Sequence, residues 1–244
     1  MGSLDALVQS IKSDPIESTG DIYHPIPFAE FNPLKPAVDE KVVYQKYRLI
    51  RSALPIDNLK GVKILDVGAN AGFFSYKFAQ LGASVDAIEP SGRYYEIGKV
   101  IASHFDLNVS WFHQSIGIDF IQGKNYDIAL MLSVFQWISG GNRNLDSAKT
   151  ILREVSLRAD YLFFELGCNW GKSAIEINTS TLRWIVQLLA ECTPYSQIGY
   201  LGTTRLWGGK WASWRYNRFL FCCTSGSAVL NPWQKFVTRV LKPH

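Results

Sequence analysis

The stretch KILDVGANAGFFSYKFAQLG, residues 63–82, decides the fold of this chain. It opens on a mostly apolar run rich in β-branched residues, which is typical of a buried strand. Gly68 and Gly72 lie in the loop that follows, and Phe74 and Phe78 then begin the apolar face of a helix. The stretch therefore predicts a strand, a glycine loop and a helix, the arrangement with which many nucleotide-cofactor sites begin.

Strands and helices alternate to either side of this stretch. Upstream, apolar residues recur at helical spacing until Pro55, which predicts a helix that ends there. Downstream, apolar runs predict strands at SVDAIEP (84–90), LNVSWFH (107–113), YDIALMLSVF (126–135), YLFFELG (161–167), SQIGYLGTTRLW (196–207) and YNRFLFCCTS (216–225). Continuous apolar strands between amphipathic helices are typical of a parallel sheet that is covered on both faces. The chain is therefore predicted to be an α/β protein.

The chain is predicted to be one domain with an arm at each end. Residues 1–40 hold half of the ten prolines and show little periodicity, so we expect an N-terminal arm or lid with at most a short helix before Asp14. The central domain spans residues 41–225. Residues 226–244 are apolar on one side and basic on the other, which favours a docked tail helix over a membrane or polyanion contact.

Composition narrows the class of protein. The apolar runs fall short of the roughly 18 residues that span a bilayer, and the first residues lack the pattern of a secretory signal. The four cysteines have no C-x-x-C spacing, so we expect buried thiols in a reducing, cytoplasmic setting and no metal site. The formal net charge of +4 permits an anionic partner without requiring one.

The glycine loop differs from that of a dinucleotide-binding fold. Such a fold would use G-x-G-x-x-G, but Asn70 and Phe73 stand at the second and third glycine positions. Asp66 ends the strand immediately before the turn. A carboxylate there would repel a diphosphate and attract a cationic cofactor.

S-adenosylmethionine is such a cofactor, because it carries an ammonium and a sulfonium and no phosphate. Asp66 could accept a hydrogen bond from the ammonium, directly or through water. Glu89 ends the next strand, where a carboxylate can accept both ribose hydroxyls at once. Gly68 and Gly72 would let the backbone pass close under the methionine part.

The pattern D-x-G-x-N-x-G, followed by an acid that closes the next strand, resembles motif I and its successor in class I SAM-dependent methyltransferases. The likeness extends from about residue 44 to residue 167 and includes QKYRLIRSALP (45–55) and YDIALMLSVFQWI (126–138). It implies a Rossmann-like, mostly parallel seven-stranded sheet with helices on both faces and an antiparallel last strand, which YNRFLFCCTS would supply.

The resemblance also implies a set of cofactor contacts. Residues after the third strand would flank the adenine, and Ser133 after the fourth would border the methionine part. Arg48 in the leading helix could reach the methionine carboxylate, although an ordinary surface arginine is the alternative. The implied set is Asp66, Gly68, Asn70, Gly72, Glu89, Gln114, Ser115, Ile116, Ser133 and Arg48.

The methyl acceptor is expected beyond the carboxyl ends of the fourth and fifth strands, under the arms. Gln136, Trp137, Glu165, Asn169 and Trp170 fall there. The candidates for a catalytic role, including removal of a proton, are Gln136, Glu165 and His24. Alternatives remain open for the last two, because a strand-end acid often caps a helix and His24 in the arm could be a surface residue. Many related chains have histidine in place of Gln136.

Three functions fit these patterns. The first is O-methylation of a sugar or glycan hydroxyl, because LDVGANAGFFSYKFAQLGA (65–83) and LSVFQWI (132–138) resemble methyltransferases found with bacterial polysaccharide synthesis. The second is RNA (tRNA) methylation, in which RLWGGKWASWRYNRF (205–219) would stack on bases and hold phosphates, unless it is only a hairpin between strands. The third is a methyltransferase-like protein that binds a partner without catalysis.

Overall fold

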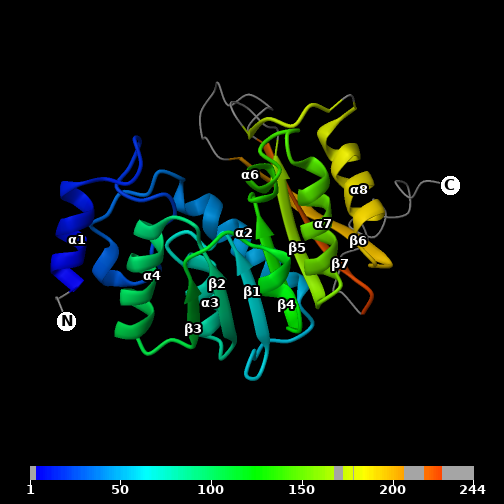
Figure 1. The fold of residues 1–244 in the computed structure, drawn as a ribbon. Coiled ribbons are helices and arrows are strands. Elements are labelled where there is room, and N and C mark those ends of the chain that lie inside the picture. The colour runs from blue at the N-terminus through cyan, green and yellow to red at the C-terminus, as the bar shows by residue number, and fades with distance from the viewer. Residues whose placement is uncertain (1–3, 168–172, 178, 206–216, 227–244) are drawn as a thin grey trace.

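The structure is a computed structural model that describes residues 4–167, 173–177, 179–205 and 217–226. Within these residues, seven strands form one sheet (Figure 1). The strands are β1 (Lys63–Val67), β2 (Ser84–Ile88), β3 (Val109–Phe112), β4 (Tyr126–Leu132), β5 (Ala159–Gly167), β6 (Gln197–Arg205) and β7 (Asn217–Thr224). The helices are α1 (Leu4–Ser13), α2 (Glu40–Ala53), α3 (Phe73–Ala79), α4 (Gly92–His104), α5 (Ile118–Ile121), α6 (Phe135–Ile138), α7 (Leu145–Ser156) and α8 (Thr181–Cys192), with a 3-10 turn at Ala29–Phe31.

The strand order is β3-β2-β1-β4-β5-β7-β6. Strands β1 to β5 are parallel, whereas β7 is antiparallel to both of its neighbours, β5 and β6. This confirms the predicted mostly parallel sheet with an antiparallel last strand. The order reverses between β1 and β4, and in such sheets ligands bind at the carboxyl ends of the strands beside the reversal.

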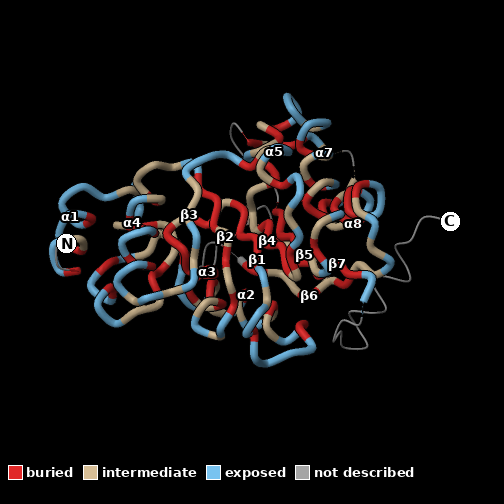
Figure 2. The backbone as a smooth tube through the Cα atoms, turned by 60° about the horizontal axis from the view of Figure 1, so that its bottom comes forward, coloured by how far each residue is buried: buried red, intermediate tan, exposed pale blue. Residues whose placement is uncertain are grey.

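The core lies on both faces of the sheet, and Figure 2 shows the buried strands at its centre. Along β5, Phe163 packs with residues of α2 and α3 on one face, while Phe164 packs with residues of α7 and α8 on the other. Because successive side chains of a strand point to opposite faces, a strand covered on both faces has to be apolar throughout. This explains the continuous apolar runs in the sequence.

Helix α2 begins at Asp39, whose side chain accepts a hydrogen bond from the backbone N–H of Lys41 (2.9 Å), and ends before Pro55. Val43 and Ile50 on one side of the helix are fully buried. A capped start and a proline stop hold the register of the helix on the sheet. This register determines which α2 side chains face the carboxyl ends of β5 and β6.

The N-terminal segment, residues 4–38, packs against α3 and α4. Figure 1 shows α1 beside α4, near the β3 edge of the sheet. Leu4, Val8 and Ile11 of α1 lie in one hydrophobic cluster with Tyr76 and Tyr94. The segment is tied down further by a hydrogen bond from the Tyr94 hydroxyl to Glu17 (2.6 Å). The boundary predicted at residue 40 stays a prediction, and the predicted tail helix lies almost wholly outside the described residues.

The glycine loop after β1 generates a stability prediction. Gly68 has φ +71°, and a Cβ at this position would lie 2.4 Å from Cγ1 of Val134. Gly61 has φ +84° but nothing within 4 Å of such a Cβ. Gly61→Ala should therefore cost only the backbone strain of about 1–2 kcal/mol. Gly68→Ala should cost about 1–3 kcal/mol more in the free energy of unfolding, because the stiff Val134 side chain has to move.

Urea unfolding of the two variants and the wild-type protein measures this difference. Equal losses for Gly68→Ala and Gly61→Ala would contradict the close approach of β1 and β4 at this loop.

Candidate cofactor and acceptor site

The glycine loop is held by the end of β2. The backbone N–H groups of Gly68 and Ala69 both donate to the carbonyl of Ile88 (2.8 and 3.0 Å), and the N–H of Asn70 donates to Oε2 of Glu89 (2.8 Å). These three donors already have protein partners and are not free to hold a diphosphate. These hydrogen bonds agree with the sequence, in which two glycines of the dinucleotide-binding motif are replaced.

Asp66 lies near the end of β1, just before this loop, and is almost completely buried (3% exposed). Its Oδ2 accepts a hydrogen bond from the Ser75 hydroxyl at 2.7 Å. Burial, with a smaller contribution from the nearby Glu89, raises the pKa of Asp66 to about 6 against the opposing hydrogen bond from Ser75. The carboxylate thus lacks a cationic partner in the described structure, and an ammonium group would supply one.

Glu89 is the second acid of the site (7% exposed). Its Oε1 accepts from the N–H of Ser91 and its Oε2 from the N–H of Asn70, both at 2.8 Å. Burial raises the pKa of Glu89, and the two backbone bonds oppose that effect. A carboxylate has about four acceptor positions, so two remain for the hydroxyls of a ribose.

Asn70 adds a third acceptor to the loop. It has φ +55°, and its Oδ1 is buried without a hydrogen-bond partner. Buried polar atoms normally have partners, so an orphaned acceptor indicates a ligand or water position. The loop and the strand ends beside it together present the carboxylates of Asp66 and Glu89 and the amide oxygen of Asn70. This set of acceptors fits the ammonium and hydroxyl donors of S-adenosylmethionine.

The residues predicted to flank the adenine follow β3. Gln114 and Ser115 are exposed, whereas Ile116 is buried in the core. The N–H of Glu89 donates to the carbonyl of Phe112 (3.0 Å), which brings the end of β3 beside the second acid. The contact of Gln114, Ser115 and Ile116 with the adenine stays a prediction.

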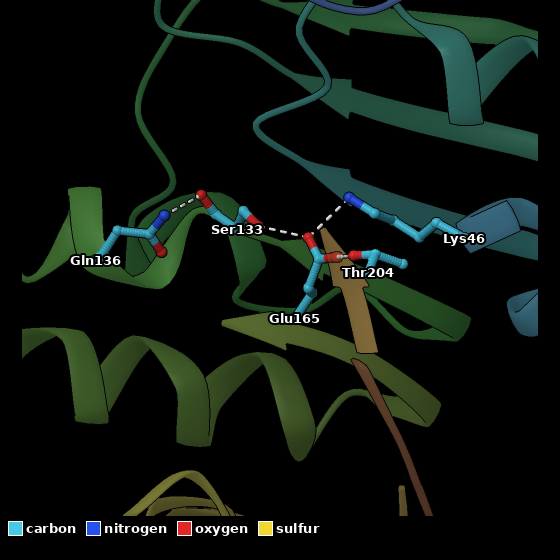
Figure 3. A network of polar contacts seen from close by, with 5 residues as sticks. All are labelled: Lys46, Ser133, Gln136, Glu165 and Thr204. Carbon is cyan, nitrogen blue, oxygen red and sulfur yellow. Dashed lines mark hydrogen bonds and ion pairs between the residues drawn. The ribbon is translucent and has the colours of Figure 1, made fainter. Parts of the chain in front are cut away.

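A second polar cluster surrounds Glu165 at the carboxyl end of β5 (Figure 3). Its Oε2 accepts from Nζ of Lys46 (2.7 Å) and from the hydroxyl of Ser133, and its Oε1 accepts from the hydroxyl of Thr204 (3.0 Å). Glu165 is fully buried. Burial alone would raise the pKa of Glu165, but Lys46, Ser133 and Arg218 outweigh it and the pKa is lowered.

Glu165 was a predicted catalytic residue, and its surroundings argue against proton transfer. A carboxylate with a lowered pKa and both oxygens engaged is a weak proton acceptor. Glu165 instead holds side chains from α2, the turn after β4 and β6 at one point, which favours a positioning role.

The chain turns sharply after β4. The predicted strand reached Phe135, but β4 ends at Leu132 because Ser133 adopts φ +59°. The N–H of Ser133 donates to the carbonyl of Glu165 (2.8 Å), and the Gln136 side chain donates to the carbonyl of Ser133 (2.8 Å). Strained residues of this kind persist where the surrounding structure holds them, often at functional sites. Gln136, also a predicted catalytic residue, braces this turn; its Oε1 is buried without a partner.

The cation that α2 contributes to the Glu165 cluster is Lys46. Arg48 is exposed, and it lies about 200° around the helix from Lys46. The predicted contact of Arg48 with the cofactor is therefore not supported by its position. Lys46 was missed by the sequence reasoning, although a signal was present: it stands between Val43 and Ile50 on the apolar side of the helix.

The structure brings His24 of the N-terminal segment to the same place. The ring of Phe74 lies 6.1 Å from the ring of His24 and 5.8 Å from Nζ of Lys46, measured to ring centroids. Burial and, to a lesser extent, the charge of Lys46 lower the pKa of His24 to about 3, against the opposing effect of Glu165. His24 is therefore uncharged at neutral pH and close to the charged cluster.

Several other predictions can be placed. Asn169 and Trp170 lie outside the described residues, as does the stretch 206–216 on which the RNA alternative depends. No group of three or more potential metal ligands occurs among the residues that the structure describes. In the same part of the chain, no helix is both long and apolar enough to cross a membrane.

Comparison with known proteins finds methyltransferases that are similar to this chain. No protein-family model matches the chain. The chain is 26% identical over 160 residues to a ubiquinone biosynthesis O-methyltransferase of Bartonella tribocorum, covering 65% of this chain and 63% of that protein. It is 25% identical over 186 residues to the protein of that name in Bradyrhizobium sp. strain ORS 278, covering 74% and 71%. The chain thus spans less than two thirds of the length of the first of these relatives.

Solved structures share the fold. The bifunctional kinase-methyltransferase WbdD superposes with a TM-score of 0.66 at 18% identity, covering 89% of this chain and 46% of that one. Magnesium protoporphyrin IX methyltransferase of Synechocystis PCC 6803, with bound SAM, gives a TM-score of 0.51 at 20% identity, covering 76% and 79%. The fold is that of these SAM-dependent methyltransferases, and the chain is similar in sequence to O-methyltransferases over about two thirds of its length.

The raised pKa of Asp66 predicts a pH dependence of cofactor binding. Above about pH 6 the carboxylate is ionised and pairs with the ammonium, whereas below it the proton must be displaced. The affinity for S-adenosylhomocysteine should therefore fall by up to about tenfold per pH unit below pH 6. Isothermal titration between about pH 5 and pH 8 measures this. Asp66→Asn should bind weakly with a flatter profile; a flat profile for the wild-type protein would contradict the assignment.

The ion pair of Lys46 and Glu165 generates a second prediction. Glu165→Gln alone leaves the buried cation Lys46 without its partner, which should cost about 3–5 kcal/mol in the free energy of unfolding. Lys46→Met should cost less, because the charge of Arg218 also acts on Glu165. The double variant should recover most of this loss. Lys99→Met, which removes a partly exposed pair with Glu96, is the control and should cost about 1 kcal/mol or less.

Urea unfolding of the four variants measures these energies. Additive losses in the double variant would show that the two side chains do not act as a pair.

Proposed function

We propose that the protein is an O-methyltransferase that transfers the methyl group of S-adenosylmethionine to a hydroxyl of a sugar or glycan. The observation that carries the proposal is the pair of buried carboxylates, Asp66 and Glu89, at the ends of neighbouring strands. A hydroxyl acceptor is supported by the O-methyltransferase relatives. The sugar is supported by the likeness of residues 65–83 and 132–138 to methyltransferases of polysaccharide synthesis.

The chemistry requires little from the protein besides positioning and removal of a proton. When bound, S-adenosylmethionine supplies an activated methyl group: its carbon–sulfur bond breaks as the oxygen–carbon bond forms, and the electron pair goes to sulfur. The acceptor hydroxyl loses its proton to a base. Holding the two reactants in line contributes much of the rate in such a displacement.

His24 is the base that the geometry favours. Its ring lies beside the Lys46–Glu165 cluster and is uncharged at neutral pH. Burial and the charge of Lys46 lower its pKa to about 3, which makes the imidazole a weak proton acceptor, so the assignment rests on its position. Glu165 has both oxygens engaged, and the amide of Gln136 is not basic. Glu165, Lys46 and Gln136 then act as positioning residues that hold the turn at Ser133 and the floor of the acceptor site.

Trp137 lies in α6, which follows the turn at Ser133, and is 70% exposed. It follows Gln136 directly and is the large aromatic side chain that α6 presents to solvent. A flat exposed ring beside a polar site can stack on a sugar ring through its apolar face. This position supports an acceptor with a ring.

A phenolic hydroxyl is a second candidate acceptor. The observation that favours it is the name shared by the curated relatives, which are O-methyltransferases of ubiquinone biosynthesis. Transfer of labelled methyl from S-adenosylmethionine to methyl glycosides and bacterial polysaccharides, compared with catechol, separates the two. Labelling of catechol alone would overturn the sugar assignment.

His24→Gln tests the base with any acceptor found in that assay. Loss of a general base should lower kcat by about 10²- to 10⁴-fold, while the affinity for S-adenosylhomocysteine stays unchanged. His104→Gln, at the exposed end of α4, is the matched control and should keep full activity. A His24→Gln variant with kcat within about twofold of wild type would exclude His24 as the base.

A further inference from the structure

Arg218 is a buried cation that the proposed mechanism does not use. It lies at the start of β7, opposite Gly167 of β5 and Thr204 of β6, and is 8% exposed. Leu220, two residues further on the same face of the strand, pairs with Glu165. The guanidinium therefore lies on the face of the sheet that carries the Glu165 cluster, at the carboxyl ends of the strands.

The charges in this buried cluster do not balance. Lys46 and Glu165 form an ion pair at 2.7 Å, which satisfies the single carboxylate. Arg218 takes part in none of the ion pairs among the described residues, and its Nε is buried without a hydrogen-bond partner. Its charge nevertheless acts on Glu165 and on the hydroxyl of Tyr23. With His24 uncharged, the cluster carries one net positive charge.

A buried guanidinium without an anion is costly, and proteins keep such a group where a ligand supplies the missing charge. Arginine presents a planar fork of donors that matches the two oxygens of a carboxylate or phosphate. We propose that Arg218 binds an oxyanion, a carboxylate or phosphate, carried by the methyl acceptor close to its reacting hydroxyl. The acceptor is then an acidic or phosphorylated sugar unit and not a neutral one.

This inference rests on the proposed function and deepens it. The same oxyanion chemistry has a second source, the carboxylate of the methionine part of the cofactor. The two sources differ in which ligand loses affinity when Arg218 is replaced. If Arg218 binds an anion on the acceptor, replacing it should leave the affinity for the cofactor unchanged. If it binds the carboxylate of the cofactor, the same replacement should weaken cofactor binding.

The test uses the full chain saturated with S-adenosylhomocysteine. Glucuronate and glucose 6-phosphate are the oxyanion probes, and glucose is the neutral control. The melting temperature should rise by a few degrees with at least one oxyanion at about 100 times its Kd, and not with glucose. Arg218→Met should lose at least about tenfold in oxyanion affinity with unchanged affinity for S-adenosylhomocysteine by titration calorimetry.

Two further variants make the result specific. Arg218→Lys keeps the charge but loses the fork, so its oxyanion affinity should lie between those of wild type and Arg218→Met. Arg183→Met removes an exposed arginine of α8 and should bind oxyanions as the wild-type protein does. Without ligand, Arg218→Met should unfold at the wild-type temperature or above, because it removes an unpaired buried charge.

Oxyanion shifts that are equal in wild type and Arg218→Met, or absent from wild type, would overturn the inference. So would weaker binding of S-adenosylhomocysteine by Arg218→Met, which would assign the arginine to the cofactor carboxylate. If Arg218→Met does not fold, Arg218→Lys decides: unchanged oxyanion affinity overturns the inference. A wild-type protein that does not bind S-adenosylhomocysteine would overturn the proposed function itself, a separate and distinguishable result.

Discussion

The rest of the site depends on the hydrogen bonds between the end of β2 and the glycine loop. The carbonyl of Ile88 and the carboxylate of Glu89 together bind three successive N–H groups of the loop, ending with that of Asn70. These bonds fix the loop beside the buried Asp66 and use two of the acceptor positions of Glu89. If Glu89 also accepts the ribose hydroxyls, as we propose, losing it would release the loop as well as the cofactor.

The acceptor side is organised around a different carboxylate. Glu165 gathers side chains from a helix, a tight turn and an edge strand, and the N-terminal segment brings His24 over the same point. Its lowered pKa makes it a permanent anion, so it holds Lys46 and the Ser133 turn at fixed positions at every physiological pH. We propose that the imidazole of His24 accepts the proton and that the positive charge of Arg218 binds the acceptor.

The parts of this account that sequence could predict are those encoded locally. Asp66 and Glu89 each stand at the end of an apolar run that sequence identifies as a strand, so their meeting at one edge follows from the parallel sheet. The Lys46–Glu165 pair joins residues 119 positions apart, and its geometry depends on the register of α2 on the sheet. Arg218 falls in a strand that the sequence predicts, but only the pairing of that strand with β5 places Arg218 near Glu165, and the sequence does not give this pairing. The end of β4 was predicted too late because nothing in the apolar run marks the left-handed turn at Ser133.

The central claim is that the loop is built for a cationic nucleoside without phosphate. Thermal unfolding of the wild-type protein with S-adenosylhomocysteine, and separately with NAD, tests it most directly. At about 100 times its Kd, S-adenosylhomocysteine should add roughly 2.7 kcal/mol of stability and raise the melting temperature by a few degrees, whereas NAD should leave it unchanged. A rise with NAD, or no rise with S-adenosylhomocysteine, would contradict the account.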